Sequence, residues 1–397
     1  MIRVRPVRYL RRAAQWIRGW GLAGVSCFAL GCVSHDEVGE YAGIGPKSAL
    51  VGAVRKTTRE AGLAEAREQL LAGLAAEDGS RGGLQRRIIR TTADGGLVLP
   101  DSLAALPAAQ RRRVALAIVP GTKAGNPNGK DRTRECLRGA AEASKAMGFS
   151  TFFLETEARG TVQENAELVG SRMREIFARS DQVILVMLSK GAHDVIRYLQ
   201  EDGVNLSAAD RAKLSVVLSL AGTLQGSVVA DWMAHSPRPL AAATRQWLHL
   251  SGQDAAIDML ESVARSPWED RTARRLSSRF PRLTWISIAM VPDGEDGRIR
   301  ERLWAPLVRG RIEKTMPYYS PSDGLVESAS SILPDVVTVP EWVVIGSGSH
   351  AMPNGTYLGG GRIAPQTTRP GKETLHPESG GEIMSAYLRA LPQDLLR

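Results

Sequence analysis

The sequence predicts an α/β fold with a mostly parallel sheet that is covered by helices on both faces. From residue 113 onward, short apolar segments alternate with segments of helical periodicity. Apolar strands separated by helices are typical of a parallel sheet buried between two helical layers. Strands are expected at residues 114–119, 150–154, 183–188, 214–220, 284–290 and 341–345, and helices at residues 131–147, 162–178 and 192–201.

Two segments outside this alternation are expected to form other structures. Arg59–Ala76 carries apolar residues at helical spacing, and residues 88–99 are expected to form a β-hairpin that turns at Asp94-Gly95. Between residues 223 and 282, helical segments rich in Trp, Ala, Arg and Leu contain no clear strand. This stretch is a candidate cap inserted after the fourth strand, with ordinary crossover helices as the alternative.

Composition and charge narrow the class of protein. The chain has 397 residues, of which 43% are hydrophobic, which suffices for a large core and excludes a largely disordered chain. The formal net charge is +9, but six arginines and no acidic residue precede residue 32, which leaves +3 for the remainder. That remainder has no nucleic-acid-binding motif, so nucleic acid is not expected as a partner. No His and Cys residues have zinc spacing and no acidic segment has a calcium-loop pattern, so neither a metal nor another cofactor is expected.

The N-terminus has the features of a bacterial export signal. An arginine-rich start is followed by Gly19–Gly31, which is apolar but too short to span a bilayer comfortably. Residues Phe28–Cys32 resemble a lipobox, in which Cys32 would be lipidated and become the mature N-terminus. Cys27 is a weaker alternative site, and an uncleaved membrane anchor is the other alternative.

These features divide the chain and predict where the protein resides. Residues 1–31 are interpreted as a signal peptide, residues 32–85 as a leader with a helix, and residues 86–397 as the α/β domain with its cap at 223–282. The protein is expected to be exported and held in the bacterial cell envelope by a lipid on Cys32, with the outer membrane as one option. Cys136 then has no partner for an intramolecular disulfide and is expected to pack within a helix.

A serine at the end of a buried strand is the first candidate for chemistry. The strand at 183–188 runs directly into Ser189, which is followed by Gly191 and a helix. A nucleophile elbow has this order, because the tight turn exposes the serine and small neighbours let the helix pack closely. The backbone N–H of Lys190 and the helix N-terminus would then face a developing oxyanion. The usual Gly-x-Ser-x-Gly pattern is incomplete, since Met187 replaces its first glycine.

Two later segments supply candidate partners for Ser189. Asp323 lies beyond the fifth expected strand, and His350 lies on a Gly- and Ser-rich loop directly after the sixth. Taken alone, Asp323 is also a common turn residue and His350 a common loop residue. The order Ser, Asp, His is that of the catalytic triad in α/β-hydrolases. His193 could line the site, but its helix carries it away from the hydroxyl. The weaker candidates, in the cap and the polar tail, are His235, His249 and His376.

These segments resemble those of bacterial lipases and related α/β-hydrolases. Ser189-Lys190-Gly191 resembles the elbow, residues 322–331 the acid loop and residues 349–352 the histidine loop. Residues 218–231 are similar to the loop after the sixth strand of such enzymes. The resemblance covers residues 113–360 and implies a serine hydrolase that cleaves a carboxylic ester of a small molecule or a lipid.

The resemblance also implies a role for each candidate. His350 would take the proton of Ser189, Ser189 would attack the carbonyl carbon, and Asp323 would orient the imidazole. The backbone N–H groups of Lys190 and Thr122 would hold the oxyanion, since Thr122 follows the strand expected to supply the second donor. The Lys190 side chain is expected to point to solvent. Three tryptophans of the candidate cap hint at an apolar acyl pocket, with helix packing as the alternative: Trp232, Trp247 and Trp268.

Two other functions stay open at this point. A thioesterase, peptidase or acyltransferase would use the same triad, because substrate choice resides in the cap and pocket. A binding protein of the envelope could keep the fold without catalysis. Ser189, Asp323 and His350 are all present in the sequence, which favours an enzyme.

Overall fold

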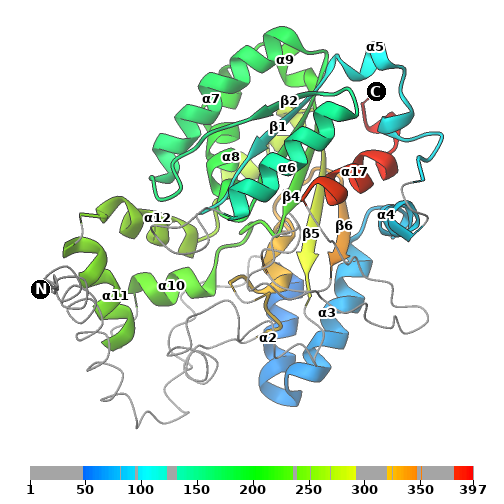
Figure 1. Ribbon diagram of the computed structural model, residues 1–397. Coiled ribbons are helices and arrows are strands. Elements are labelled where there is room, and N and C mark those ends of the chain that lie inside the picture. Colours follow the sequence, from blue (N-terminus) through cyan, green and yellow to red (C-terminus); the bar gives the residue numbers. More distant parts are fainter. Residues whose placement is uncertain are drawn as a thin grey trace, which may run out of the picture.

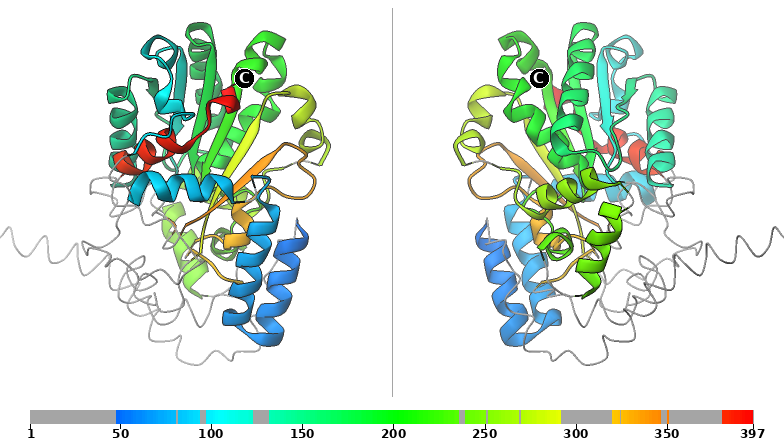
Figure 2. Two further views of the ribbon diagram at one scale, coloured as in Figure 1. Left: turned by 90° about the vertical axis from the view of Figure 1, so that its right-hand side faces the viewer. Right: turned by 90° about the vertical axis from the view of Figure 1, so that its left-hand side faces the viewer.

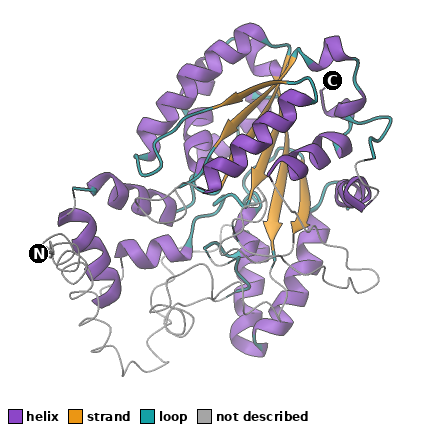
Figure 3. Cartoon of the chain, in the orientation of Figure 1, coloured by secondary structure: helices purple, strands orange, loops and turns teal. Residues whose placement is uncertain are grey.

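The computed structural model has a single described sheet of six parallel strands (Figures 1 and 3). It describes residues 48–80, 82–93, 97–122, 132–235, 239–250, 252–268, 270–291, 320–323, 325–346, 350 and 380–396. The strands are β1 (Val114–Val119), β2 (Ser150–Phe153), β3 (Gln182–Leu188), β4 (Leu214–Leu220), β5 (Thr284–Met290) and β6 (Glu341–Gly346). Their order in the sheet is β2-β1-β3-β4-β5-β6, and every pairing is parallel. The predicted α/β fold with six strands is therefore confirmed.

Helices cover both faces of this sheet (Figure 2). One face carries α4 (Gly83–Ala93), α6 (Arg132–Ala146) and α17 (Gly380–Ala390), and the other carries α7 (Val162–Arg179) and α8 (Gly191–Gln200). Successive strand residues point to opposite faces, so Leu116 and Ile118 join the first apolar cluster while Ala117 and Val119 join the second. The residues of β1, β3, β4 and β5 are buried except for the first of β3 and of β5, as the continuous apolar segments predict, whereas the edge strand β2 is half-buried.

An N-terminal helical hairpin packs at the end of the sheet where the strand arrows of β5 and β6 point (Figures 1 and 2). It consists of α2 (Ala49–Ala61) and α3 (Leu63–Glu77). The single helix expected at 59–76 is thus wrong at its start, because Gly62 has a φ of 91° and breaks the helix there. Leu70 and Leu74 of α3 are fully buried against the ends of β5 and β6.

The β-hairpin expected at 88–99 is also wrong. Its first arm belongs to helix α4, in which Leu84, Ile88 and Thr91 are buried one turn apart. The edge of β6 is covered by polar groups from the connection between α3 and α4 and from the first turn of α4. Asp78 Oδ1 accepts from the Val343 N–H (2.9 Å), and Gln85 Oε1 accepts from the N–H of residue 345 (3.3 Å). These bonds satisfy an edge that would otherwise be open to another strand.

A run of helices separates β4 from β5, where the cap is expected. It comprises α10 (Val228–His235), α11 (Pro239–Leu250), α12 (Asp254–Ala264), α13 (Asp270–Ala273) and α14 (Leu276–Arg279). Helices α10 and α12 share a small apolar cluster of their own, centred on Met259 and Val263. After α12 the chain returns to the main core, where Trp268 packs edge-to-face on Trp285 of β5 with ring centroids 5.6 Å apart. Helices α10 and α12 of the insertion thus form an apolar cluster of their own, whereas the chain after α12 packs on the main core.

The tryptophans of this insertion have unlike surroundings. Trp268 is 5% exposed and packs in the core, as the alternative of ordinary packing predicts. Trp247 on α11 is 53% exposed. The Trp232 side chain lies outside the described part of the structure.

Shorter elements complete the described chain. They are η2 (Leu103–Ala105), α5 (Ala108–Arg111), η3 (Asp202–Asn205), α9 (Ala208–Lys213), η4 (Ser328–Ser331) and η6 (Gln393–Leu396). Within the described ranges, no helix combines the length and the apolar character that crossing a membrane requires. The expected signal peptide and the lipidation site Cys32 lie outside the described residues. Cys136 lies half-buried in α6.

Candidate active site

Ser189 occupies a strained turn between β3 and α8. Its φ is 52°, in the left-handed region that residues other than glycine rarely adopt. Its backbone N–H donates to the Leu220 carbonyl at the end of β4 (3.1 Å), and its carbonyl accepts from the Ala192 N–H (3.0 Å). Ala221, directly after β4, has a φ of 45°. Two adjacent strands thus end in unfavourable backbone conformations side by side, which is typical of a functional site.

Two glycines let the backbone approach Ser189 closely. A Cβ on Gly191 would lie 2.8 Å from the Pro120 carbonyl oxygen, and a Cβ on Gly121 would lie 3.0 Å from the Ser189 Cβ. The end of β1 therefore lies directly against the turn, as the small neighbours of Ser189 predict. Met187, which replaces the first glycine of the usual pattern, is fully buried in the apolar cluster under α7 and α8.

The structure brings His350 and Asp323 to Ser189. His350 Nε2 lies 2.6 Å from Ser189 Oγ, and His350 Nδ1 lies 2.7 Å from Asp323 Oδ2. The His350 backbone N–H also donates to the Asp323 carbonyl (2.9 Å). Three residues separated by up to 161 positions in the chain thus form one hydrogen-bonded series. The geometry is that of a nucleophile, a base and an orienting acid.

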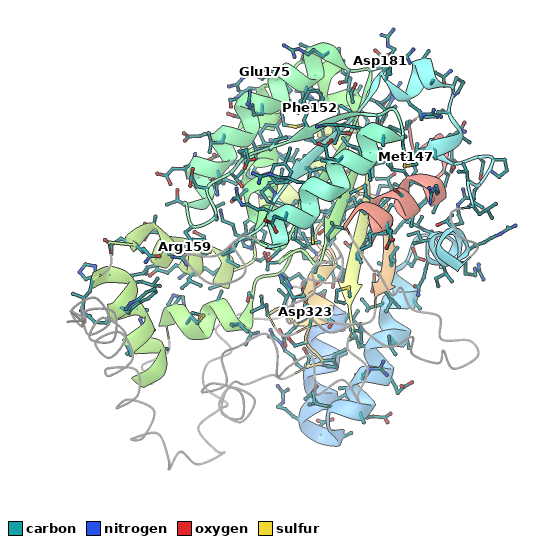
Figure 4. All side chains as sticks on the ribbon, in the orientation of Figure 1. Met147, Phe152, Arg159, Glu175, Asp181 and Asp323 are labelled. Atoms are coloured by element: carbon teal, nitrogen blue, oxygen red, sulfur yellow. The ribbon has the colours of Figure 1, made fainter. Side chains whose placement is uncertain are left out.

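Asp323 is held by hydrogen bonds to both of its carboxylate oxygens. Its side chain is fully buried, and its Oδ1 accepts from the backbone N–H groups of Leu325 (3.0 Å) and Val326 (2.8 Å). Because Oδ2 faces His350, both carboxylate oxygens have partners. An Nδ1–H directed at Oδ2 leaves Nε2 to accept the Ser189 hydroxyl proton. Figure 4 shows Asp323 at the end of the sheet where the strand arrows point, and Asp181, which precedes β3, at the opposite end.

Two residues with backbone N–H groups lie at the turn that carries Ser189, namely Lys190 and Thr122. Lys190 begins the first turn of α8, and its backbone N–H donates to no acceptor among the described residues. Thr122 follows Gly121 at the end of β1, whose close contact with Ser189 places it at the same turn. Thr122 Oγ1 lies 4.0 Å from the Met259 sulfur, so α12 of the insertion reaches this end of the sheet. Lys190 and Thr122, the residues expected to supply the oxyanion donors, thus both lie at the turn that carries Ser189.

The Lys190 side chain does not point to solvent, and that expectation is wrong. Lys190 is 2% exposed, and its Nζ lies 2.9 Å from Asp194 Oδ1 and 3.0 Å from Asp194 Oδ2. Asn165 of α7 donates to Asp194 Oδ2 (3.3 Å) and to the Glu157 carbonyl (2.9 Å). Burial raises the pKa of the Asp194 carboxyl to about 7, against the opposing effect of the Lys190 ammonium.

Sequence reasoning missed Asp194 and Asn165 as supports of the turn. The available signal was the spacing of Lys190 and Asp194, which puts opposite charges one turn apart on α8. What the spacing does not show is that α7 covers this face of α8, so that a pair normally exposed becomes buried.

None of the other histidines that the structure describes forms a hydrogen bond with Ser189. His193 is buried in α8, and burial lowers its pKa to about 3, so it is neutral near pH 7. His235 pairs with Asp231 (2.9 Å) and His249 pairs with Asp254 (2.7 Å), both on the inserted helices. His376 lies outside the described residues. In the ranges that the structure describes, no group of His, Cys, Asp and Glu could hold a metal ion.

The parallel sheet, the serine at a strained strand-to-helix turn and the chain order Ser, Asp, His define the architecture. The chain has the α/β-hydrolase fold. No protein-family model matches the sequence, and no curated protein matches it.

Several solved structures are similar to this chain at low sequence identity. A metagenomic carboxyl esterase is 20% identical, with 80% of this chain and 92% of the esterase covered and a TM-score of 0.46. A lipase of Bacillus licheniformis in its mature form is 17% identical, with 60% and 86% covered and a TM-score of 0.39. Phospholipase PlaB of Legionella pneumophila is 13% identical, with 55% and 45% covered and a TM-score of 0.36. Similarity at this level does not identify the chemistry, which depends on the residues of the site.

Proposed function

We propose that this protein is a serine hydrolase that cleaves a carboxylic ester through an acyl-enzyme on Ser189. The observation that carries the proposal is the hydrogen-bonded series from Ser189 Oγ through His350 to Asp323, at distances of 2.6 and 2.7 Å. Ser189 stands on a strained turn, with a φ of 52° that residues other than glycine rarely adopt.

The first half of the reaction transfers the acyl group to the protein. His350 Nε2 takes the hydroxyl proton as Ser189 Oγ bonds to the carbonyl carbon of the ester. The carbonyl oxygen gains the negative charge, and the backbone N–H groups of Lys190 and Thr122 donate to it. The bond to the leaving alcohol then breaks, and His350 returns its proton to the alcohol oxygen.

The second half repeats these steps with water. His350 takes a proton from water as the water oxygen bonds to the acyl carbon, and the bond to Ser189 Oγ breaks. The free acid leaves, and Oγ regains its proton from His350. Throughout, Asp323 keeps Nδ1 protonated and stabilises the imidazolium, because its own two backbone donors hold the carboxylate in place.

We also propose that the protein acts in the bacterial cell envelope, tethered by a lipid on Cys32. The support is the arginine-rich start, the apolar segment Gly19–Gly31 and the lipobox-like residues that precede Cys32. Metabolic labelling with an alkyne fatty acid is expected to mark the wild type and not Cys32→Ser. Equal labelling of the two would contradict the anchor and leave the hydrolase proposal untouched.

Hydrolysis of p-nitrophenyl butyrate and octanoate by the full-length protein in detergent tests the proposed reaction. The wild type is expected to turn over at least one ester, and Ser189→Ala should lose at least roughly 10⁴-fold in kcat. The control is a melting temperature of Ser189→Ala equal to that of the wild type or higher, since the variant loses only a hydroxyl. A folded wild type that cleaves neither these esters nor the matching thioesters would favour a binding protein. Hydrolysis that survives in Ser189→Ala would contradict the assigned nucleophile.

A further inference from the structure

A buried ion pair joins the N-terminal hairpin to the segment that carries Asp323. Arg55 of α2 donates from Nε to both carboxylate oxygens of Glu327, at 3.0 and 3.2 Å, and its Nη2 donates to Oε2. The two side chains are 7% and 1% exposed. The partners are 272 positions apart in the chain, so the pair is a purely tertiary contact.

Glu327 organises the segment around Asp323, here called the acid segment (residues 320–331, of which all but residue 324 are described). Its Oε1 accepts from the Ser320 hydroxyl (2.7 Å), and its backbone forms an isolated antiparallel bridge with Ser322. Its carbonyl accepts from the Ser330 N–H (2.7 Å). One residue therefore fastens both ends of the acid segment to each other.

The bridge at Glu327 lies next to the hydrogen bonds that position Asp323. Asp323 donates its N–H to the Val326 carbonyl (3.0 Å), and Val326 donates its N–H to Asp323 Oδ1 (2.8 Å). Val326 is the neighbour of Glu327, so a displacement of Glu327 would move a donor of the carboxylate that faces His350. The route from Arg55 to Asp323 is thus two residues long.

The same hairpin also packs on the acid segment through apolar contacts. Val51 and Val54 of α2 share a buried cluster with Ala329 and Ile332. Apolar side chains at 55 and 327 would have extended this cluster at little cost, because well-packed hydrophobic residues often replace a buried ion pair without loss of stability. A charged pair fixes the orientation of its side chains, which apolar packing does not, because the planar guanidinium holds the carboxylate by two hydrogen bonds.

We propose that Arg55 is a positioning residue for the Asp323 carboxylate and acts through Glu327. The N-terminal hairpin is then part of the machinery that sets the rate of ester cleavage, although it lies outside the sheet and its covering helices. This inference rests on the proposed function, because the position of Asp323 affects a rate only if Ser189, His350 and Asp323 act together.

The test compares full-length variants that remove the pair without leaving an unpaired charge. Arg55→Met combined with Glu327→Gln keeps an acceptor for Ser320 and buries no lone ion. We expect kcat for p-nitrophenyl butyrate to fall roughly 10- to 100-fold with KM within about twofold, as for small misplacements of catalytic groups. Arg55→Lys, which restores one charged contact, should recover part of the loss. In an Asp323→Ala background, the same double change should have no further effect on kcat.

A matched control separates positioning from general loosening of the hairpin. Leu70→Ala removes apolar contacts of α3 from the same cluster and is expected to lower the melting temperature without lowering kcat. Equal loss of kcat in Leu70→Ala at a similar melting temperature would overturn the proposal. An unchanged kcat in the folded double variant, or a full additional loss in the Asp323→Ala background, would also overturn it.

Hydrogen exchange of the acid segment decides the question independently of activity. The double variant is expected to exchange the amides of residues 325–331 at least about tenfold faster than the wild type, because their fastening is lost. Unchanged exchange would overturn the proposal. If the wild type shows no hydrolysis that depends on Ser189, the proposed function fails, while the exchange result still reports whether Arg55 holds the segment.

Discussion

The two ends of the Ser189–His350–Asp323 series are supported in different ways, although each has a buried ion pair. At the nucleophile end, Lys190 and Asp194 are four residues apart on one helix, with side chains 3% and 0% exposed. At the acid end, the Arg55–Glu327 pair joins segments 272 positions apart. Ser189, Lys190 and Asp194 lie on one strand, one turn and one helix that follow one another in the chain. The acid end depends on contacts that form only when the whole chain has folded.

Further contacts at the acid end show the same distant origin. Gln225, beyond β4, donates its N–H to the Ser330 carbonyl (3.0 Å), and Ser227 donates its hydroxyl to the Leu325 carbonyl (2.7 Å). The acid segment is thus attached to α2 and to the chain after β4. The difference between the two ends is that the nucleophile and its ion pair belong to one continuous segment, whereas the acid is held by hydrogen bonds from distant parts of the chain.

The largest effect is expected from Asp323→Asn, which replaces the carboxylate that faces His350 by an amide. The amide cannot hold His350 in the tautomer that accepts the Ser189 proton, so kcat should fall roughly 10³- to 10⁴-fold. The fold should remain, because the amide oxygen can still accept from Leu325 and Val326. Ester hydrolysis and thermal unfolding of the same preparation check both halves of this prediction. A loss of less than tenfold would mean that Asp323 does not act through His350.

Asp194→Leu tests the nucleophile end. It leaves the Lys190 ammonium buried without its partner, so the free energy of unfolding should fall by roughly 3–5 kcal/mol. Lys190→Met combined with Asp194→Leu should restore most of this stability, because no lone charge remains and the apolar side chains fill the space. Urea denaturation measures each difference. A double variant as unstable as Asp194→Leu would show that the pair itself, and not the unpaired charge, stabilises the turn.

Glu341→Gln gives a smaller effect that depends on pH and concerns the acid end. Glu341 accepts from the Leu333 N–H (3.0 Å), just beyond the acid segment, and from the Ser287 hydroxyl. Burial raises the pKa of its carboxyl from 4.5 to about 7. The native state therefore binds the proton more tightly than the unfolded state, and stability falls as the pH rises from about 4.5 to about 7.

Above pH 7, Glu341→Gln is expected to be more stable than the wild type by up to about 3 kcal/mol, with the difference vanishing near pH 4.5. Urea denaturation between pH 4.5 and 8.5 measures this difference. Glu142→Gln, at an exposed position on α6, serves as the control and should show no such pH dependence. A pH-independent difference for Glu341→Gln would contradict the raised pKa.

The sequence predicts the sheet because buried parallel strands are continuous apolar segments. It predicts Ser189 for a local reason, since a strand, a serine and a glycine in succession describe the turn almost completely. It also predicts Asp323 and His350, because both follow strands whose ends meet at one edge of the sheet. The structure brings all three together as expected.

The wrong predictions concern residues whose structure is determined by tertiary contacts. The Lys190 side chain is buried because α7 covers it, and the sequence of α8 alone does not reveal that neighbour. Residues 88–92 carry β-branched side chains typical of a strand. They are nevertheless helical, because Leu84 and Ile88 lie one helical turn apart and both pack in the first apolar cluster. The Arg55–Glu327 pair has no local signal in the sequence.

Labelling with a fluorophosphonate tests the central claim most directly, because only a serine activated by a base reacts readily with it. The full-length wild type should form one adduct, which mass spectrometry should locate on the peptide that contains Ser189. His350→Ala should react at least about 10³-fold more slowly, and Ser189→Ala should not react at all. A folded wild type that forms no adduct, or an adduct that persists in Ser189→Ala, would contradict the assignment of Ser189 as an activated nucleophile.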